Sequence, residues 1–163
     1  MSETNNIVHP FMPLYDENSR TLILGSFPSV KSREEMFFYG HPQNRFWKLI
    51  AELYGEKVPQ SIKDKKTLIL KNNLALWDTI KSCTITGSSD SSVKDVVPND
   101  ISEILKNSKV DRIFCNGALS YKMYMKYIYP KTKIEAVKLP STSPANAAFS
   151  IERLKAAWGV INE

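Results

Sequence analysis

The sequence predicts an α/β protein built around a parallel β-sheet that helices cover on both faces. Two observations carry this prediction. Short apolar runs bounded by turn residues indicate buried strands, and segments with helical features lie between successive runs. Parallel strands need such crossover helices, which leave the sheet buried on both sides. The four strands are expected at residues 21–27, 74–80, 110–117 and 133–141.

The first strand, "TLILGSF", is a short apolar run stopped by Gly25, which is typical of a buried strand that enters a turn. Segment 44–54 predicts a helix, because its apolar residues recur at helical spacing and Gly55 follows as a stop. These apolar residues are Phe46, Trp47, Ile50, Leu53 and Tyr54. A lysine-rich segment at 61–72 predicts a second helix, ahead of the second strand "LALWDTI".

The remainder of the chain continues the alternation. Residues 82–100 are expected to form a polar loop. Asp100 and Glu103 make a capping-box pattern at the start of "ISEILKNS", which predicts a short helix. A helix through "ALSYKMYMKYI" separates the third and fourth strands, and the loop "TSPANAAF" leads to a final helix at 150–161.

The composition indicates one globular domain over residues 1–163, of which residues 1–19 form an irregular lead-in. No stretch approaches the roughly 18 apolar residues that cross a membrane, and no signal peptide opens the chain. Cys83 and Cys115 lie far apart without metal-ligand spacing, which is typical of reduced thiols in a cytoplasmic protein. We expect a cytoplasmic monomer.

Charge and motifs narrow the function. The net charge of +5, with a pI near 9.1, suits a polyanionic partner, but the lysines form no solid basic block and ordinary solvated surface explains them equally. The nucleotide and hydrolase patterns GxGxxG, GxxxxGK[ST] and GxSxG are absent. A two-histidine metal site would need both His9 and His41, and His9 lies in the lead-in. We therefore expect no metal and no cofactor.

Ligands of such folds bind at the carboxyl ends of the strands. The informative residues should therefore follow the four apolar runs. They are "GSFPS" (25–29), "WDTIKS" (77–82), "CNG" (115–117) and "LPSTSPANA" (139–147).

Three motifs in order, "GSFPS", then "FYGHPQNRFW" (38–47) opening a helix, and "LPSTSPANA", resemble the uracil-DNA glycosylase superfamily. The nearest branch is the hypoxanthine (deoxyinosine) DNA glycosylases, with the mismatch-specific uracil glycosylases as cousins. The cousins share the core His41, Pro42, Asn44, Arg45, Phe46 and Trp47. The resemblance covers about residues 21–160 and implies a three-layer α/β/α sandwich with a four-stranded parallel sheet, with DNA running over the strand ends.

The chemistry of base excision matches these residue types. Cleaving the glycosidic C–N bond passes through an oxocarbenium-like sugar while negative charge develops on the departing base. The enzyme must extrude the nucleotide, stack its base on an aromatic ring and position a water. It must also hold the strand by its phosphates.

The catalytic residue follows from the resemblance. The third position of the first motif usually carries a water-activating Asn or Asp, and here it is Phe27, which cannot polarise water. The hypoxanthine branch is similar in lacking that group, and there the asparagine of the HP-x-N segment, Asn44 here, takes the role. Asn44 also stands where a helix N-cap belongs, and capping alone would justify it.

The expected base-binding residues are Tyr39, Ser26, Phe27, His41 and Asp78. Tyr39 matches the base-stacking ring of the cousins, and stacking is favoured over the alternative that it fills the core with a satisfied hydroxyl. His41 contacts substrate or is structural, and Asp78 touches the base edge or caps a turn. Phe46 and Trp47 are expected in the core, given their helical spacing with Ile50.

The expected DNA-backbone residues are Ser29, Ser141, Thr142, Ser143 and Asn146. Within the loop 141–146, which matches the family's second motif, short hydroxyl and amide donors approach phosphates closely. The alternative is a turn whose hydroxyls cap the last helix. The family's intercalating residue falls near Ala145 or Asn146, where the side chain is small for a wedge.

These observations predict a monofunctional DNA glycosylase of base-excision repair. Its substrate is DNA that contains deaminated bases, with hypoxanthine favoured and uracil second. Two alternatives remain open: a non-catalytic DNA-binding module on the same fold, which Phe27 makes plausible, and a small-nucleoside hydrolase.

Overall fold

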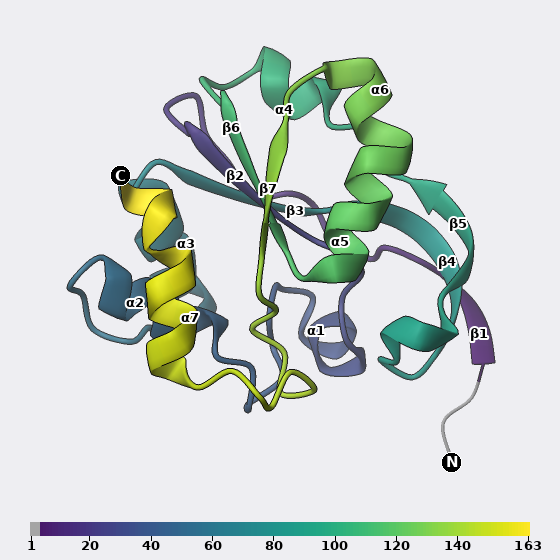
Figure 1. The fold of residues 1–163 in the computed structure, drawn as a ribbon, viewed down its shortest axis with the longest axis horizontal. Coiled ribbons are helices and arrows are strands. Elements are labelled where there is room, and N and C mark those ends of the chain that lie inside the picture. Colours follow the sequence, from purple (N-terminus) through teal and green to yellow (C-terminus); the bar gives the residue numbers. More distant parts are fainter. Residues whose placement is uncertain (1–3) are drawn as a thin grey trace.

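The computed structural model describes residues 4–163. Its centre is a parallel sheet of β2 (Thr21–Gly25), β3 (Leu74–Asp78), β6 (Arg112–Asn116) and β7 (Ala136–Leu139), in the order β3-β2-β6-β7 (Figure 1). All three neighbouring pairs are parallel, and every residue of β2 and β3 is buried. The sequence-based strand predictions are confirmed, with ends trimmed by one to three residues.

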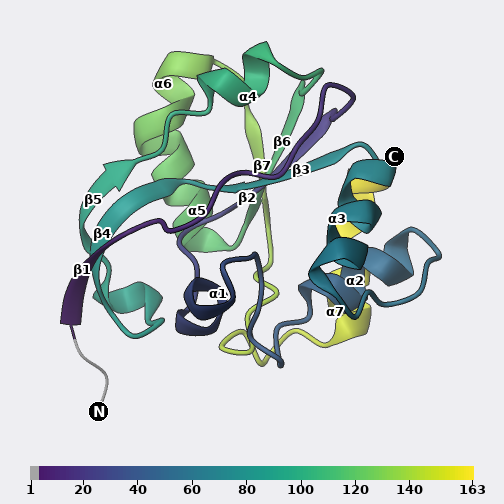
Figure 2. The ribbon, with the colours of Figure 1, turned by 180° about the vertical axis from the view of Figure 1, so that it is seen from behind.

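Helices cover both faces of this sheet. On one side lie α2 (Phe46–Leu53), α3 (Ile62–Lys71) and α7 (Ile151–Trp158) (Figures 1 and 2). On the other, α5 (Ala118–Met123) continues through a π-helical turn (Tyr124–Ile128) into α6 (Tyr129–Thr132). The predicted three-layer sandwich is therefore confirmed.

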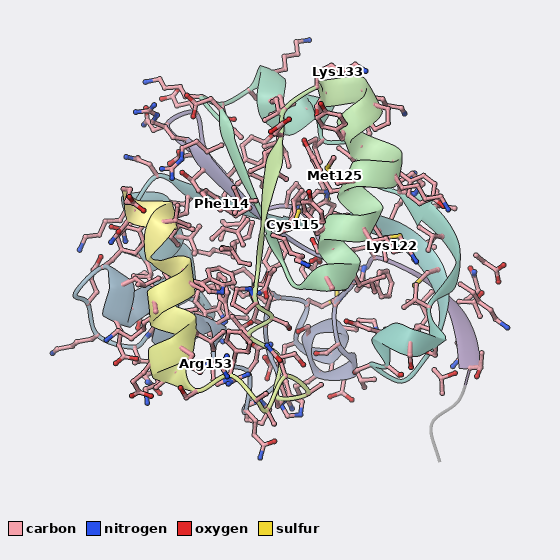
Figure 3. The ribbon with its side chains drawn as sticks, in the orientation of Figure 1. Phe114, Cys115, Lys122, Met125, Lys133 and Arg153 are labelled. Atoms are coloured by element: carbon pink, nitrogen blue, oxygen red, sulfur yellow. The ribbon has the colours of Figure 1, made fainter. Side chains whose placement is uncertain are left out.

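The hydrophobic core fills the space between sheet and helices. Phe114 and Cys115 of β6 lie inside it, whereas Lys122 and Lys133 lie on the outer helical layer (Figure 3). Phe46 and Trp47 of α2 are buried in it as expected, and α7 contributes the fully buried Trp158. Removing these large apolar side chains from water is the main favourable contribution to folding.

A second, smaller sheet contradicts two of the sequence predictions. β1 (Thr4–Val8), β4 (Ile80–Thr86) and β5 (Lys94–Pro98) pair antiparallel in the order β1-β4-β5. The prediction of an irregular lead-in was therefore wrong for residues 4–8, whereas 9–19 do lack a named strand or helix and 1–3 lie outside the described residues. The prediction of a polar loop over 82–100 was wrong as well. Register shifts around Ser82 break the regular alternation that would have marked β4 as a strand.

The inward face of β4 explains why the second sheet forms. Ile80, Cys83 and Ile85 are buried, with a register shift between the first two, and they pack with Met123 of α5 in a small cluster of their own. The sheet thus extends the helical layer on the side of α5 and carries its hairpin tip toward the carboxyl ends of the parallel strands (Figure 1).

Two local features also differ from expectation. A short helix, α1 (Val30–Glu35), follows β2, where only a turn was predicted. In α4 (Ser102–Lys106), Asp100 Oδ1 accepts from the Ser102 N–H, but the Glu103 carboxylate accepts from Asn107 instead of returning to the cap. The capping box is therefore only half formed.

Within residues 4–163, the helices are all too short or too polar to cross a membrane.

Candidate active site

A cavity of about 500 Å³ opens at the carboxyl ends of the parallel strands. Each of the four predicted strand-end segments contributes to its wall, as expected for a doubly covered parallel sheet. The lining residues include Ser26, Phe27, Ser29, Tyr39, His41, Asn44, Asp78, Asn116, Ser141, Thr142 and Ser143. Of the predicted site residues, Asn146 alone is absent from this wall; it lines a neighbouring hollow on the far side of the 141–146 loop.

Glycines allow the strand ends to approach one another. A Cβ on Gly25 would lie 2.4 Å from Asp78 Oδ1 and 3.2 Å from the Tyr39 hydroxyl, so no larger residue fits without displacing them. Gly117 has a φ of +95° and would bring a Cβ to within 3.2 Å of Ser141. Backbone that adopts this conformation strongly favours glycine.

The floor of the cavity, as we use the term, consists of Asp78, Tyr39 and Asn116, and His9 supports it by binding Asp78 without lining the cavity itself. Asp78 ends β3, is 4% exposed, and its Oδ2 lies 2.7 Å from His9 Nε2. His9 is held by rings on several sides, with ring-centre distances of 4.5 Å to both Phe11 and Trp77. The sequence prediction missed His9 because it follows a strand hidden in the supposed lead-in.

The hydrogen bonds of His9 define the proton arrangement of the pair. The Phe11 N–H donates to Nδ1 at 3.5 Å, so Nδ1 accepts. A carboxylate only accepts, so Nε2 must donate to Asp78. One carboxylate oxygen is thus held by His9, whereas Oδ1 lies beside Gly25 at the cavity wall.

Tyr39 presents its ring and a buried hydroxyl. Its backbone is left-handed, with a φ of 53°, and one ring face stacks on Phe46 with centres 4.0 Å apart. Among the described residues the hydroxyl makes no hydrogen bond of normal geometry. Burial, followed by the nearby Asp78 carboxylate, raises its pKa well above the usual range, although the Asn116 amide opposes the shift. A buried donor without a partner is costly unless a ligand accepts from it.

The rim of the cavity, defined as Asn44, His41, Ser141 and Ser143, is more open. Asn44 Oδ1 accepts from the Phe46 N–H at 2.9 Å, but the N-cap of α2 is Arg45, so the prediction of Asn44 as the N-cap was wrong by one residue. Its NH₂ group has no partner within residues 4–163, and the oxygen keeps a second lone pair. His41 Nδ1 accepts from the Gln43 N–H, so the other ring nitrogen remains available.

The hydroxyls predicted to contact phosphates differ in how they are engaged. Ser29 caps α1 by accepting from the Ser32 N–H, and its own proton goes to Ser32 Oγ. Thr142 is fully buried and accepts from Asn116 Nδ2 at 3.0 Å. Asn146 donates to the Ser141 carbonyl.

Ser141 and Ser143 are in a different situation. Each accepts from a backbone N–H two residues ahead, that of Ser143 and of Ala145 respectively. Their hydroxyl protons are therefore the ones that a ligand on this loop could use.

The tip of the β4–β5 hairpin supplies a wall that the sequence prediction missed. Ser88, Ser89, Asp90 and Ser91 line the cavity. The Val30 N–H donates to Ser88 Oγ, and Arg33 donates to the Gly87 carbonyl at 3.0 Å. The sequence could not place these residues at the cavity, because the β4–β5 hairpin that brings them there was not predicted.

Thiol and metal chemistry have little support in this cavity. Cys83 and Cys115 are buried and free, and burial raises the pKa of both thiols, that of Cys115 to about 12. Protonated thiols are poor nucleophiles. Among the described residues, no three His, Cys, Asp or Glu side chains gather as a metal site would require.

Comparison with known proteins agrees with this architecture. The model of the uracil DNA glycosylase superfamily matches residues 12–162. The chain belongs to this superfamily. The match extends over the parallel sheet and every predicted site residue.

Individual relatives are more specific. A hypoxanthine DNA glycosylase of Methanosarcina acetivorans is 36% identical over 155 residues, which cover 93% of this chain and 95% of the relative. One from Methanosarcina barkeri is 36% identical over 154 residues, or 91% and 93%. A solution NMR structure of a candidate uracil DNA glycosylase from Methanosarcina acetivorans has a TM-score of 0.79 at 31% identity, covering 96% of this chain and all of that one.

Proposed function

We propose that this protein is a monofunctional DNA glycosylase that hydrolyses the N-glycosidic bond of hypoxanthine in DNA, with uracil as a second substrate. The proposal rests on one cavity at the strand ends of a chain of this superfamily. This cavity combines the partly unbonded amide of Asn44, the ring of Tyr39 and the carboxylate of Asp78. Two relatives named hypoxanthine DNA glycosylase support the choice of base.

Asn44 is the proposed catalytic residue. The Phe46 N–H fixes the orientation of its amide, leaving one lone pair of Oδ1 and the NH₂ group for substrate and water. A water held by Oδ1 attacks the sugar C1′, the C1′–N9 bond breaks, and the base departs with the electron pair and takes up a proton. Such a preorganised polar group acts on charge as it develops. Phe27 packs at the same cavity without contributing a polar group.

The floor is the proposed base-recognition surface. Hypoxanthine and uracil both present a ring N–H next to a carbonyl, and Asp78 Oδ1 can accept from that N–H while His9 holds Oδ2. Adenine instead presents a ring-nitrogen acceptor there, which a carboxylate repels. The Tyr39 ring lines this space and is proposed to stack on the base. Ser26 and His41 line the same space.

The strand is proposed to be held by the 141–146 loop. Ser141 and Ser143 have hydroxyl protons to donate to phosphate oxygens, and Thr142 and Asn146 hold the loop through Asn116 and the Ser141 carbonyl. Ser29 is engaged in capping α1. No metal or cofactor enters this reaction. We further propose that the protein acts as a monomer in the cytoplasm, where its two free, buried thiols suit a reducing compartment.

The proposal is tested by incubating the protein with three substrates: oligonucleotides that carry hypoxanthine or uracil, and free inosine. Alkali cleavage then reports abasic sites. We expect abasic sites on hypoxanthine DNA, fewer on uracil DNA, and no hydrolysis of free inosine. Binding without abasic sites would support the non-catalytic module, and hydrolysis of free inosine would support the nucleoside hydrolase. Strand cleavage without alkali would contradict a monofunctional mechanism.

A further inference from the structure

Arg45, the residue after Asn44, is bound to the loop that we propose holds the phosphates. Its guanidinium donates to four main-chain carbonyls of that loop and the turn after it. Nε bonds Thr142 O at 3.3 Å, Nη2 bonds Ser143 O at 2.8 Å and Asn146 O at 3.1 Å, and Nη1 bonds Phe149 O. The Arg45 backbone N–H also donates to Thr142 O.

The charge of Arg45 is not neutralised by an acidic partner. All its side-chain acceptors are neutral carbonyls, and within residues 4–163 no carboxylate oxygen lies within 4.0 Å of its guanidinium. A partly buried cation without a counter-ion costs stability unless an anion approaches. The segment 141–150 contains no lysine or arginine of its own. Arg153 donates to the Ala148 carbonyl and Lys138 lines the hollow beside the loop, but Arg45 alone among the described cations donates to the carbonyls of Thr142, Ser143 and Asn146. A phosphate on this loop would therefore interact with the charge of Arg45 through the loop's own peptide groups.

A chain of hydrogen bonds connects this charge to the loop surface. Arg45 donates to the Thr142 carbonyl, and the N–H of that same peptide unit, which belongs to Ser143, donates to Ser141 Oγ. Donation to a carbonyl polarises its peptide, and polarised bonds in series strengthen one another. The Ser141 hydroxyl is consequently a stronger donor toward a ligand than an isolated serine.

We propose that Arg45 is the positioning residue of the phosphate subsite. It shapes the 141–149 segment through its carbonyls and supplies, from behind the loop, the positive charge that binds a DNA phosphate. It does not touch the DNA itself. Because Arg45 is adjacent to Asn44, phosphate binding on the loop also fixes the segment that bears the proposed catalytic amide. This inference rests on the proposed function, which supplies the DNA substrate.

The chain contains a matched control in Arg112. This arginine starts β6, at the opposite end of the sheet from the cavity, and its guanidinium likewise donates to main-chain carbonyls, those of Val160, Ile161 and Glu163. Losing Arg112 therefore removes the same kind of structural contact from a place that no DNA at the cavity reaches.

The experiment compares Arg45→Gln, Arg45→Lys and Arg112→Gln with the parent on hypoxanthine DNA. Affinity is measured across salt concentrations, excision in single turnovers, and stability by thermal melting, with all assays well below the lowest midpoint. Gln removes the charge, whereas Lys keeps the charge but cannot reproduce the planar fork. The slope of log affinity against log salt counts the phosphates neutralised, at about 0.9 per phosphate.

For Arg45→Gln we expect the slope to become shallower by about 0.9. Excision should slow on the order of a hundredfold, because a preorganised electrostatic group is lost. Arg45→Lys should keep the parental slope and slow excision about tenfold, through loss of charge-assisted bonds that shape the loop. Arg112→Gln should melt lower than the parent yet keep both slope and rate.

Several results would overturn the proposal. An unchanged slope in Arg45→Gln, or effects no larger than those of Arg112→Gln, would make Arg45 a purely structural residue. A shallower salt slope in Arg45→Lys would show that the slope does not depend on the charge at position 45, which would also count against the proposal. If the parent itself neither bound nor excised hypoxanthine DNA, the proposed function would fall together with this inference. If the parent is active and Arg45→Gln binds and excises as the parent does, only this inference falls and the proposed function stands.

Discussion

The floor and the rim of the cavity differ in how their polar groups are satisfied. On the floor, Asp78 is almost fully buried and one of its oxygens is bound by a histidine that is itself packed among rings. At the rim, Asn44 Oδ1 accepts one hydrogen bond, from the Phe46 N–H. The Ser141 hydroxyl accepts from the Ser143 N–H, but among the described residues nothing accepts its proton. A floor whose polar groups are held in place suits the recognition of one base shape. A rim whose polar groups keep unused hydrogen-bonding capacity suits the binding of water and phosphate.

The largest effect is expected from a substitution of Asn44 at the rim. A serine there still accepts from the Phe46 N–H two residues ahead, because a serine hydroxyl forms the same kind of side-chain turn as an asparagine amide. Its hydroxyl is too short to hold the attacking water in the same place. We predict that Asn44→Ser melts like the parent but excises hypoxanthine at least about a hundredfold more slowly. Single-turnover rates and thermal melts of the same preparation decide this, and a fully active variant would leave Asn44 with the turn contact alone.

On the floor, the most informative change is Asp78→Asn. The single amide oxygen would accept from His9 Nε2, so the NH₂ group would face the base and oppose its ring N–H. We expect a loss of about 2–3 kcal/mol in transition-state stabilisation on hypoxanthine. Excision of 1-methylhypoxanthine, which lacks that proton, is expected to be slow in both proteins. An equal loss on the two bases would mean that Asp78 supports the fold without contacting the ring N–H.

Tyr39 separates the ring from its hydroxyl. Tyr39→Ala should lose roughly 1–3 kcal/mol of stacking on the base. Tyr39→Phe keeps the ring and should retain most activity. It should also melt no lower than the parent, because it removes a buried hydroxyl that has no partner among the described residues. Equal kinetic damage from both variants would point to donation by the hydroxyl to a base carbonyl.

The smallest expected effect is that of a chelator. Excess EDTA should leave excision unchanged, because the proposed reaction uses an amide, a ring and hydroxyls. Activity that disappears with EDTA and returns specifically with zinc or magnesium would overturn the metal-free mechanism.

The sequence was informative where a residue's role depends on its position at a strand end. Apolar runs located the four parallel strands, so the cavity and most of its lining residues could be predicted. His9 could not, because its support of the floor requires β1 to pair with β4 and bring it beside Asp78, and both strands carry polar outer faces. The bonds of Arg45 to a loop about a hundred residues away are likewise a product of tertiary packing, which local patterns do not encode.

Hydrogen-bond engagement was a second limit of prediction from sequence. Ser29, Thr142 and Ser141 are chemically similar hydroxyl residues in neighbouring motifs. In the structure, the first caps a helix and the second is buried against Asn116, while the third remains available to a ligand. Which hydroxyl is spent on the fold depends on the distance to backbone groups that become neighbours only after folding.

The most direct test of the division between floor and rim measures two quantities on the parent, Asn44→Ser and Asp78→Asn. One is the affinity for hypoxanthine DNA relative to undamaged DNA, and the other is the single-turnover excision rate. We predict that Asn44→Ser keeps the parental affinity ratio while its rate falls at least about a hundredfold, and that Asp78→Asn loses most of the affinity ratio. A variant at Asn44 that loses the ratio, or one at Asp78 that keeps it, would contradict the separation of recognition from chemistry.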